Sequence, residues 1–155
     1  IGSLDVTLYD SNAALPWKFT DGIEYTFPYP GAMIPAGGYL LMVKDMTTYL
    51  AQYGIPPFGV PVLGPYDGKL GNSGEKLELS MPGDVDELGE RQYIRVERVN
   101  YSDGSHHEDF EQLPWPVDPW PTAADGYGSS LRRINPQRYG NDPNNWTAAS
   151  PTPGY

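Results

Sequence analysis

Glycine and proline account for 35 of the 155 residues (18 Gly and 17 Pro), and this density limits what the chain can fold into. Glycine weakens the interiors of helices and strands, and proline lacks the backbone N–H that both structures use. The segments between these residues are short, and several alternate apolar with more polar side chains. Residues 4–9 are one example, with Leu4, Val6 and Leu8 in alternate positions. Alternation is the period of a half-buried strand, so the sequence predicts short strands joined by turns.

The clearest turn is Asp21-Gly22, which lies between two runs rich in aromatic residues, 17–20 and 23–27. Asp-Gly favours a two-residue type I′ turn, because that turn needs a positive φ at both positions. The sequence therefore predicts a hairpin here, with the aromatic side chains of both runs on one face.

Further strands are expected at 39–43, 60–63, 76–80, 90–101 and 129–134. Residues 39–43 are apolar throughout and predict a strand buried on both faces. The apolar phase of 90–101 changes along its length, which predicts a β-bulge near Glu97-Arg98. Residues 82–89 are expected to form a loop, and residues 135–155 an irregular C-terminal tail anchored by packing of Trp146.

The sequence predicts one short helix, which begins after Asp45 and ends at Tyr53, before Gly54. Aspartate is a favoured helix N-cap and glycine a favoured residue after the last turn. The expected buried face consists of Met46, Tyr49, Leu50 and Tyr53, at positions i, i+3, i+4 and i+7. Seven or eight short strands with one helix predict an all-β protein, a β-sandwich with Greek-key-like connections, as a single domain over 1–155.

The charge of the chain argues against nucleic-acid binding and against binding to an anionic membrane surface. The 10 Lys and Arg residues are outnumbered by 20 Asp and Glu residues, which gives a net charge of −10. Nucleic-acid binders need clustered cations, and the only adjacent basic pair here is Arg132-Arg133. No apolar run is long enough to insert in a bilayer. The absence of cysteine excludes disulfides, thiolate catalysis and zinc sites built on cysteine.

Several segments, taken together and in order, resemble the lamin tail domain family, in the form found in bacterial proteins. They are residues 17–23, 34–40, 70–79, 99–103, 120–121, 124–131, 145–146 and 151–154. The resemblance implies an immunoglobulin-like β-sandwich that serves as an accessory module of a large secreted or cell-surface protein. The family usually opens with one or two strands ahead of the stretch that matches residues 4–9, and here that opening is missing or abbreviated. A missing first strand would leave an unpaired sheet edge near the N-terminus.

Two groups of residues are candidates for metal binding. The first group, in an acidic segment, consists of Asp84, Asp86 and Glu87. An EF-hand needs a ligand at position 5 and a glutamate at position 12 of its loop. Counted from Asp84, these positions hold Leu88 and Arg95, so the segment is not an EF-hand. A calcium site of another kind and a solvated acidic turn both remain as interpretations. The second group consists of His106, His107 and Asp109, which would serve a metal-assisted hydrolase or simply lie in a solvated loop.

Trp115 and Trp120 lie among prolines and are candidates for an aromatic platform that binds a polysaccharide or a peptide. The competing interpretation is that their rings belong to the core. No nucleophile elbow or phosphate-binding loop is present in the sequence.

We therefore expect a non-catalytic extracellular binding or scaffolding module that uses no cofactor, with calcium as the one cofactor to consider. The expected partner is another protein, or a second copy of the chain, which adds a strand at the sheet edge near the N-terminus. The alternative is a calcium-stabilised or carbohydrate-binding accessory module, and an enzyme is the least favoured class.

Overall fold

A computed structural model describes residues 3–105 and 117–155. Among the described residues, strands contain 38% and there is a single α-helix, which confirms the all-β class. Contacts divide the chain into two compact units. Unit 1 comprises the described parts of Ile1–Lys69, Glu78–Glu97 and Thr152–Tyr155, and unit 2 those of Leu70–Leu77 and Arg98–Pro151. Two long strands each run through both units, and the single domain stays a prediction.

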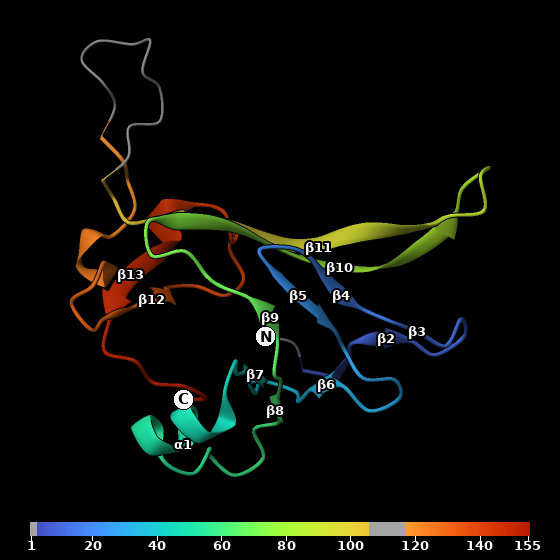
Figure 1. Ribbon diagram of the computed structural model, residues 1–155, viewed down its shortest axis with the longest axis horizontal. Coiled ribbons are helices and arrows are strands. Elements are labelled where there is room, and N and C mark those ends of the chain that lie inside the picture. The colour runs from blue at the N-terminus through green and yellow to red at the C-terminus, as the bar shows by residue number, and fades with distance from the viewer. Residues whose placement is uncertain (1–2, 106–116) are drawn as a thin grey trace. The chain divides into compact units, whose positions relative to one another are not determined.

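The elements are short apart from those two strands (Figure 1). In chain order the strands are β1 (Val6–Thr7), β2 (Tyr9–Asp10), β3 (Leu15–Pro16), β4 (Lys18–Asp21), β5 (Ile23–Thr26), β6 (Met33–Ile34), β7 (Leu41–Met42), β8 (Val62–Leu63), β9 (Asp67–Gly68), β10 (Gly74–Val85), β11 (Arg91–Ser102), β12 (Ser130–Arg133) and β13 (Trp146–Ala149). The helix is α1 (Met46–Tyr53), and two 3-10 turns are η1 (Thr122–Ala124) and η2 (Pro143–Asn145). The largest sheet has five strands in the order β11-β10-β4-β5-β9.

The single strand predicted over residues 4–9 is divided in two by Leu8. On one side, β1 pairs antiparallel with β6, and on the other, β2 pairs antiparallel with β3. The amide of Leu8 donates to the carbonyl of Ala32, and its own carbonyl accepts from the amide of Trp17. The chain thus changes hydrogen-bonding partner at Leu8, and the Leu8 side chain is buried in the main core with Phe27 and Ala32.

The predicted hairpin is confirmed, but the predicted two-residue type I′ turn is wrong. β4 and β5 pair antiparallel with Phe19 opposite Tyr25, which places Gly22 at the centre of the connection. A two-residue Asp21-Gly22 turn would have placed Phe19 opposite a different residue. Only Gly22 has a positive φ, at 87°, and Asp21 does not. The rings of Phe19 and Tyr25 both pack on Phe27, so the expected shared aromatic face is present.

The helix begins and ends as predicted. Asp45 is its N-cap, with Oδ1 accepting from the Thr48 amide at 2.5 Å, and the amide of Gly54 donates to the carbonyl of Leu50. The predicted buried face is only partly correct, because Tyr49 is buried while Met46, Leu50 and Tyr53 are substantially exposed. A helix of two turns presents few side chains to the core at once, and here one residue makes that contact.

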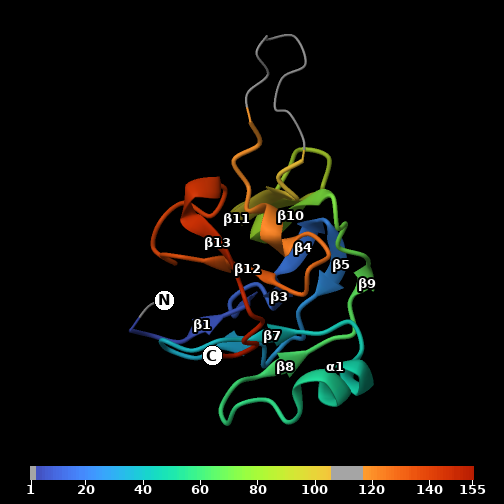
Figure 2. The same cartoon turned by 90° about the vertical axis from the view of Figure 1, so that its left-hand side faces the viewer.

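Three other strand predictions need correction. Residues 39–43 do not form a strand buried on both faces: only β7 is strand, and it forms a two-stranded parallel pair with β8 (Figure 2). The predicted loop 82–89 is wrong at its start, because β10 continues through Pro82 to Val85. The C-terminal tail is not irregular throughout, since β13 pairs antiparallel with β12.

Candidate functional site

Of the two tryptophans proposed as an aromatic platform, the structure describes only one. Trp115 lies outside the described residues. Trp120 is only 7% exposed, and its ring centroid lies 6.0 Å from that of Trp146 within unit 2. Binding of a sugar or peptide face needs an accessible ring, so the packing of Trp120 favours the core interpretation. Trp146 packs against Trp120 and its indole Nε1 donates to the carbonyl of Gly140 at 2.7 Å, while its packing on a sandwich stays a prediction.

The acidic segment forms the turn that connects β10 to β11. The amide of Asp86 donates to the carbonyl of Glu90, and the amide of Gly89 donates back to Asp86. Gly89 has a φ of 84°, which gives a type I turn followed by a glycine bulge. The Asp86 carboxylate accepts from the amides of Leu88 and Glu90 and from the Gln92 side chain. The Asp86 carboxylate is therefore already used in hydrogen bonds that stabilise the turn. Asp84 and Glu87 are exposed.

The bonds to Asp86 make the turn sensitive to acid. The amide of Glu90, above all, holds the pKa of Asp86 below its usual value of 3.8, with further contributions from Leu88 and Gln92. A lowered pKa in the folded state means that the stabilisation is present above pH 3.8 and is lost as the pH falls through the lower, folded-state value. We expect Asp86→Ala to lower the melting temperature near neutral pH, and this difference from the wild type to shrink in strong acid. Asp84→Ala is the matched control, and an equal effect of both variants would contradict the assignment.

The histidine cluster, His106, His107 and Asp109, lies outside the described residues. Within residues 3–105 and 117–155, no three His, Asp or Glu side chains are grouped so that they could hold a metal ion. The calcium and hydrolase alternatives stay predictions. Over the same residues, the chain has no helix with the length and apolar character needed to cross a bilayer.

Unit 2 contains a cavity of about 510 Å³ that sequence reasoning did not find. Its apolar lining includes Leu70, Leu77, Val99, Leu131 and Trp146, and its polar lining includes Asp103, Asp125, Ser129 and Ser130. This volume falls in the usual range of small-molecule sites. Apolar walls with hydroxyl and carboxylate groups suit a ligand that has an apolar face and several hydroxyls. The residues come from four separate segments, which left no local sequence signal.

A second, more polar cavity of about 450 Å³ lies in unit 2, next to Asp118 and Trp120. Asp118 is buried, and its carboxylate accepts from the Ser102 hydroxyl and from the amide of Trp120 at 2.9 Å. A buried carboxylate needs such partners, because its charge has lost water. These bonds tie the end of β11 to the segment before η1 and give Asp118 a structural role.

The N-terminal edge was predicted from the sequence, and the structure describes its geometry. β1 has β6 on one side, and no strand lies on its other side within the described residues. Leu4, just before β1, is 77% exposed, and Val6, within β1, is 41% exposed. The Asp5 carboxylate accepts from the amide of Ala36 at 2.8 Å, which holds the approach to β1 in place.

A protruding apolar loop follows α1 and was not predicted. Ile55 and Phe58 are almost fully exposed, between Gly54 and Gly59. Pro56 and Pro57 separate them, so no helix or strand pattern marked this loop. Comparisons of the chain with protein-family models, with curated proteins and with solved structures found no match.

Proposed function

We propose that this chain is a non-catalytic binding or scaffolding module of a larger secreted or cell-surface bacterial protein, with an immunoglobulin-like sandwich similar to a lamin tail domain. Segments that carry the resemblance form regular structure in the expected order. Residues 17–23 contain β4 and the hairpin turn, residues 70–79 lead into β10, and residues 124–131 lead into β12. These positions support the proposed fold and leave the family membership as a proposal.

The open side of β1 is the observation that carries the proposed function. An edge strand presents unpaired N–H and C=O groups, which another strand can satisfy. Leu4 and Val6 place exposed apolar side chains beside that edge. A partner strand would gain affinity from main-chain hydrogen bonds and selectivity from contacts with these side chains. The partner is another segment of the parent protein or a second copy of this chain.

Light scattering after size-exclusion chromatography, over a concentration series, tests association through β1. We expect the mass to rise above 17.1 kDa with concentration, and the amides of residues 4–7 to become protected from hydrogen exchange. Val6→Lys should reduce both effects, because a charged side chain discourages pairing at an edge. Thr147→Lys, at an exposed position of β13, is the matched control. A mass of 17.1 kDa at every concentration, with no protection of these amides, would contradict self-association through β1.

A further inference from the structure

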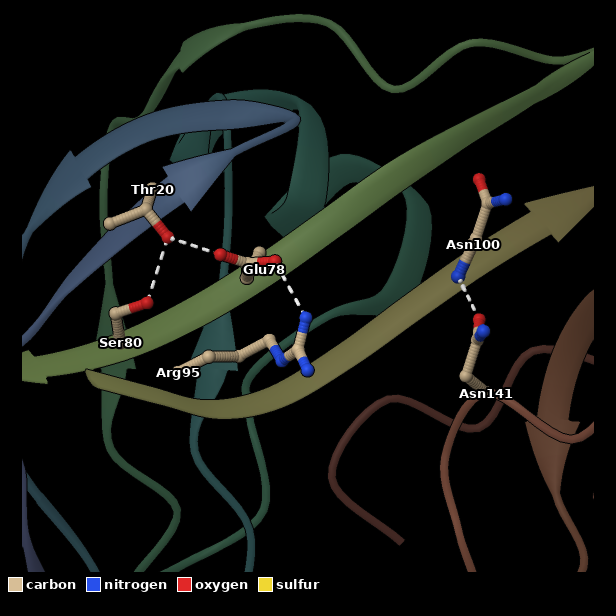
Figure 3. A network of polar contacts seen from close by, with 6 residues as sticks. All are labelled: Thr20, Glu78, Ser80, Arg95, Asn100 and Asn141. Carbon is tan, nitrogen blue, oxygen red and sulfur yellow. Dashed lines mark hydrogen bonds and ion pairs between the residues drawn. The ribbon is translucent and has the colours of Figure 1, made fainter. Parts of the chain in front are cut away.

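A second sheet edge lies along β11, at the end of the five-stranded sheet. β10 pairs with β11 on one side, and no strand lies on the other side within the described residues. Half of the backbone N–H and C=O groups of an edge strand point away from its neighbour. The edge is covered at Asn100, whose amide donates to Asn141 Oδ1 at 2.5 Å (Figure 3). No described side chain is bonded in this way to the backbone of Arg91–Val96.

The side chains along this open segment are exposed and include apolar residues. Ile94 is 51% exposed and Val96 45% exposed, two positions apart on one face of the strand. On the other face, Tyr93 has the Lys18 ammonium 3.8 Å from its ring centroid, and the Arg95 guanidinium lies 3.7 Å from Glu78 (Figure 3). An exposed edge with apolar side chains is a site where a further strand is expected to add.

The sequence of this segment is complementary to itself in an antiparallel arrangement centred on Ile94. Ile94 would lie opposite Ile94 of the second copy. The other opposite pairs are Tyr93 with Arg95, Gln92 with Val96 and Arg91 with Glu97, each occurring twice. Arg91 with Glu97 joins opposite charges, and Tyr93 with Arg95 is a cation–π pair. None of these pairs joins like charges, and both arginines also keep a contact within their own copy, as Arg91 does with the Gly83 carbonyl at 2.8 Å.

Symmetry and charge argue against the registers centred on Tyr93, Arg95 and Val96. Hydrogen-bonded and non-hydrogen-bonded pairs alternate along an antiparallel ladder, so a two-fold axis must pass between a residue and its own copy. An axis at Tyr93 would place Arg91 opposite Arg95, and an axis at Arg95 would place that arginine opposite itself. An axis at Val96 would place Ile94 opposite Arg98 and would need the edge at Asn100, where Asn141 is already bonded. The register centred on Ile94 avoids all three conflicts.

The charge of the segment argues against a strongly basic partner strand, whereas a second copy supplies its own Glu97 opposite Arg91. Residues 91–98 contain three arginines and one glutamate, a net charge of +2 in a chain of net charge −10. Two copies that meet here bring two such positive segments together, and the two Arg91–Glu97 pairs offset part of their repulsion. Exposed ion pairs contribute only about 0–1 kcal/mol each, so the charges set the register more than the affinity. The main-chain bonds and the Ile94 contact provide the attraction.

We propose that two copies of this chain pair antiparallel through the outer edge of β11, with Ile94 on the two-fold axis, to form one continuous ten-stranded sheet. This interface is closed, because each copy uses the same edge. It uses a different edge from that of β1, which belongs to another sheet.

Charge reversal tests the pairing of Arg91 with Glu97. Light scattering of the wild type should reach twice the chain mass of 17.1 kDa. Arg91→Glu should raise the dissociation constant at least about tenfold, because it creates two like-charge contacts. The double variant Arg91→Glu with Glu97→Arg should restore dimerisation to near the wild-type value. Arg132→Glu makes the same charge change at an exposed position of β12 and should leave the dimer unchanged. Circular dichroism confirms the fold of each variant.

Cysteine cross-linking tests the register, since the chain has no cysteine of its own. Opposite residues have Cα atoms about 4.5–5.5 Å apart, within the range that a disulfide spans. Ile94→Cys should therefore oxidise to a covalent dimer. Gln92→Cys and Val96→Cys should each cross-link poorly alone, because each residue lies about 14 Å from its own copy. A mixture of these two variants should cross-link efficiently, and Thr147→Cys is the exposed control.

A monomer at every accessible concentration, or cross-linking of Ile94→Cys no faster than that of Thr147→Cys, would overturn the proposal. Failure of the double charge reversal to restore the dimer would overturn the register. The two edges give separate results: Val6→Lys should leave the β11 dimer intact, and Arg91→Glu should leave any association through β1 in place.

Discussion

Leu8→Ala is expected to destabilise the protein by about 3 kcal/mol, because it opens a cavity in the main core. Leu8 is 1% exposed and packs with Phe27 and Ala32. The neighbouring backbone cannot easily collapse into the space, since the Leu8 amide and carbonyl are both bonded, to Ala32 and Trp17. Urea unfolding followed by tryptophan fluorescence measures the change in the free energy of unfolding.

The matched control is Leu4→Ala, which removes the same atoms from a side chain that is 77% exposed. Its effect should stay within about 0.5 kcal/mol. A loss of less than about 1 kcal/mol for Leu8→Ala would mean that the core adjusts around this position, and would contradict the expectation that the backbone bonds of Leu8 prevent collapse.

Asn145→Ala is expected to destabilise unit 2 by about 3 kcal/mol, because it removes three hydrogen bonds made by a buried side chain. The Asn145 side chain is buried, and its Oδ1 accepts from the amide of Asn135 at 3.0 Å. Its Nδ2 donates to the carbonyls of Asn135 and Tyr139, at 2.9 and 3.3 Å. One side chain thus holds the loop between β12 and η2. Urea unfolding gives the loss of stability, and hydrogen exchange should show faster exchange of the Asn135 amide.

Asn144→Ala is the control for this variant, since the adjacent Asn144 is exposed and donates only to Asp142 Oδ1. Its effect should be below about 0.5 kcal/mol. Equal losses from the two asparagine variants would contradict the central role of Asn145.

Leu8→Ala and Asn145→Ala also test the prediction of a single domain. Leu8 lies in unit 1 and Asn145 in unit 2, and β10 and β11 run through both units. We expect one unfolding transition that both variants shift together. Two transitions, each shifted by only one variant, would show that the units unfold separately.

Local signals predicted the elements whose stabilising contacts are themselves local. The helix is the clearest case, because Asp45 bonds to the Thr48 amide and Gly54 closes the last turn, all within ten residues. At the hairpin around Gly22, packing overrides the local sequence signal. Asp21-Gly22 favours a two-residue turn, but burial of Phe19 and Tyr25 against Phe27 requires the other register. A shift of one residue would turn one strand's aromatic side chains to the opposite face, which costs more than the turn preference provides.

Some features of the candidate sites were also visible in the sequence, and others depended on the tertiary structure. The acidic turn was visible in the sequence, but the bonds of Asp86 to Leu88, Glu90 and Gln92 depend on how the turn closes. The cavity of unit 2 was not visible at all, since its walls come from segments far apart in the chain. The burial of Trp120 was one of two interpretations, and its contact with Trp146 favours that interpretation.

The sequence by itself determined the all-β class, the position of the helix, the hairpin and the presence of strands near 62, 76–80, 91–101 and 130–133, because turn residues and alternation act over a few positions. Only the tertiary structure decided that Leu8 divides the first strand, that β10 continues through Pro82, and that β11 lies at the edge of the five-stranded sheet. These outcomes depend on which strand lies alongside, and that choice is made by burial and hydrogen bonding between residues distant in the chain.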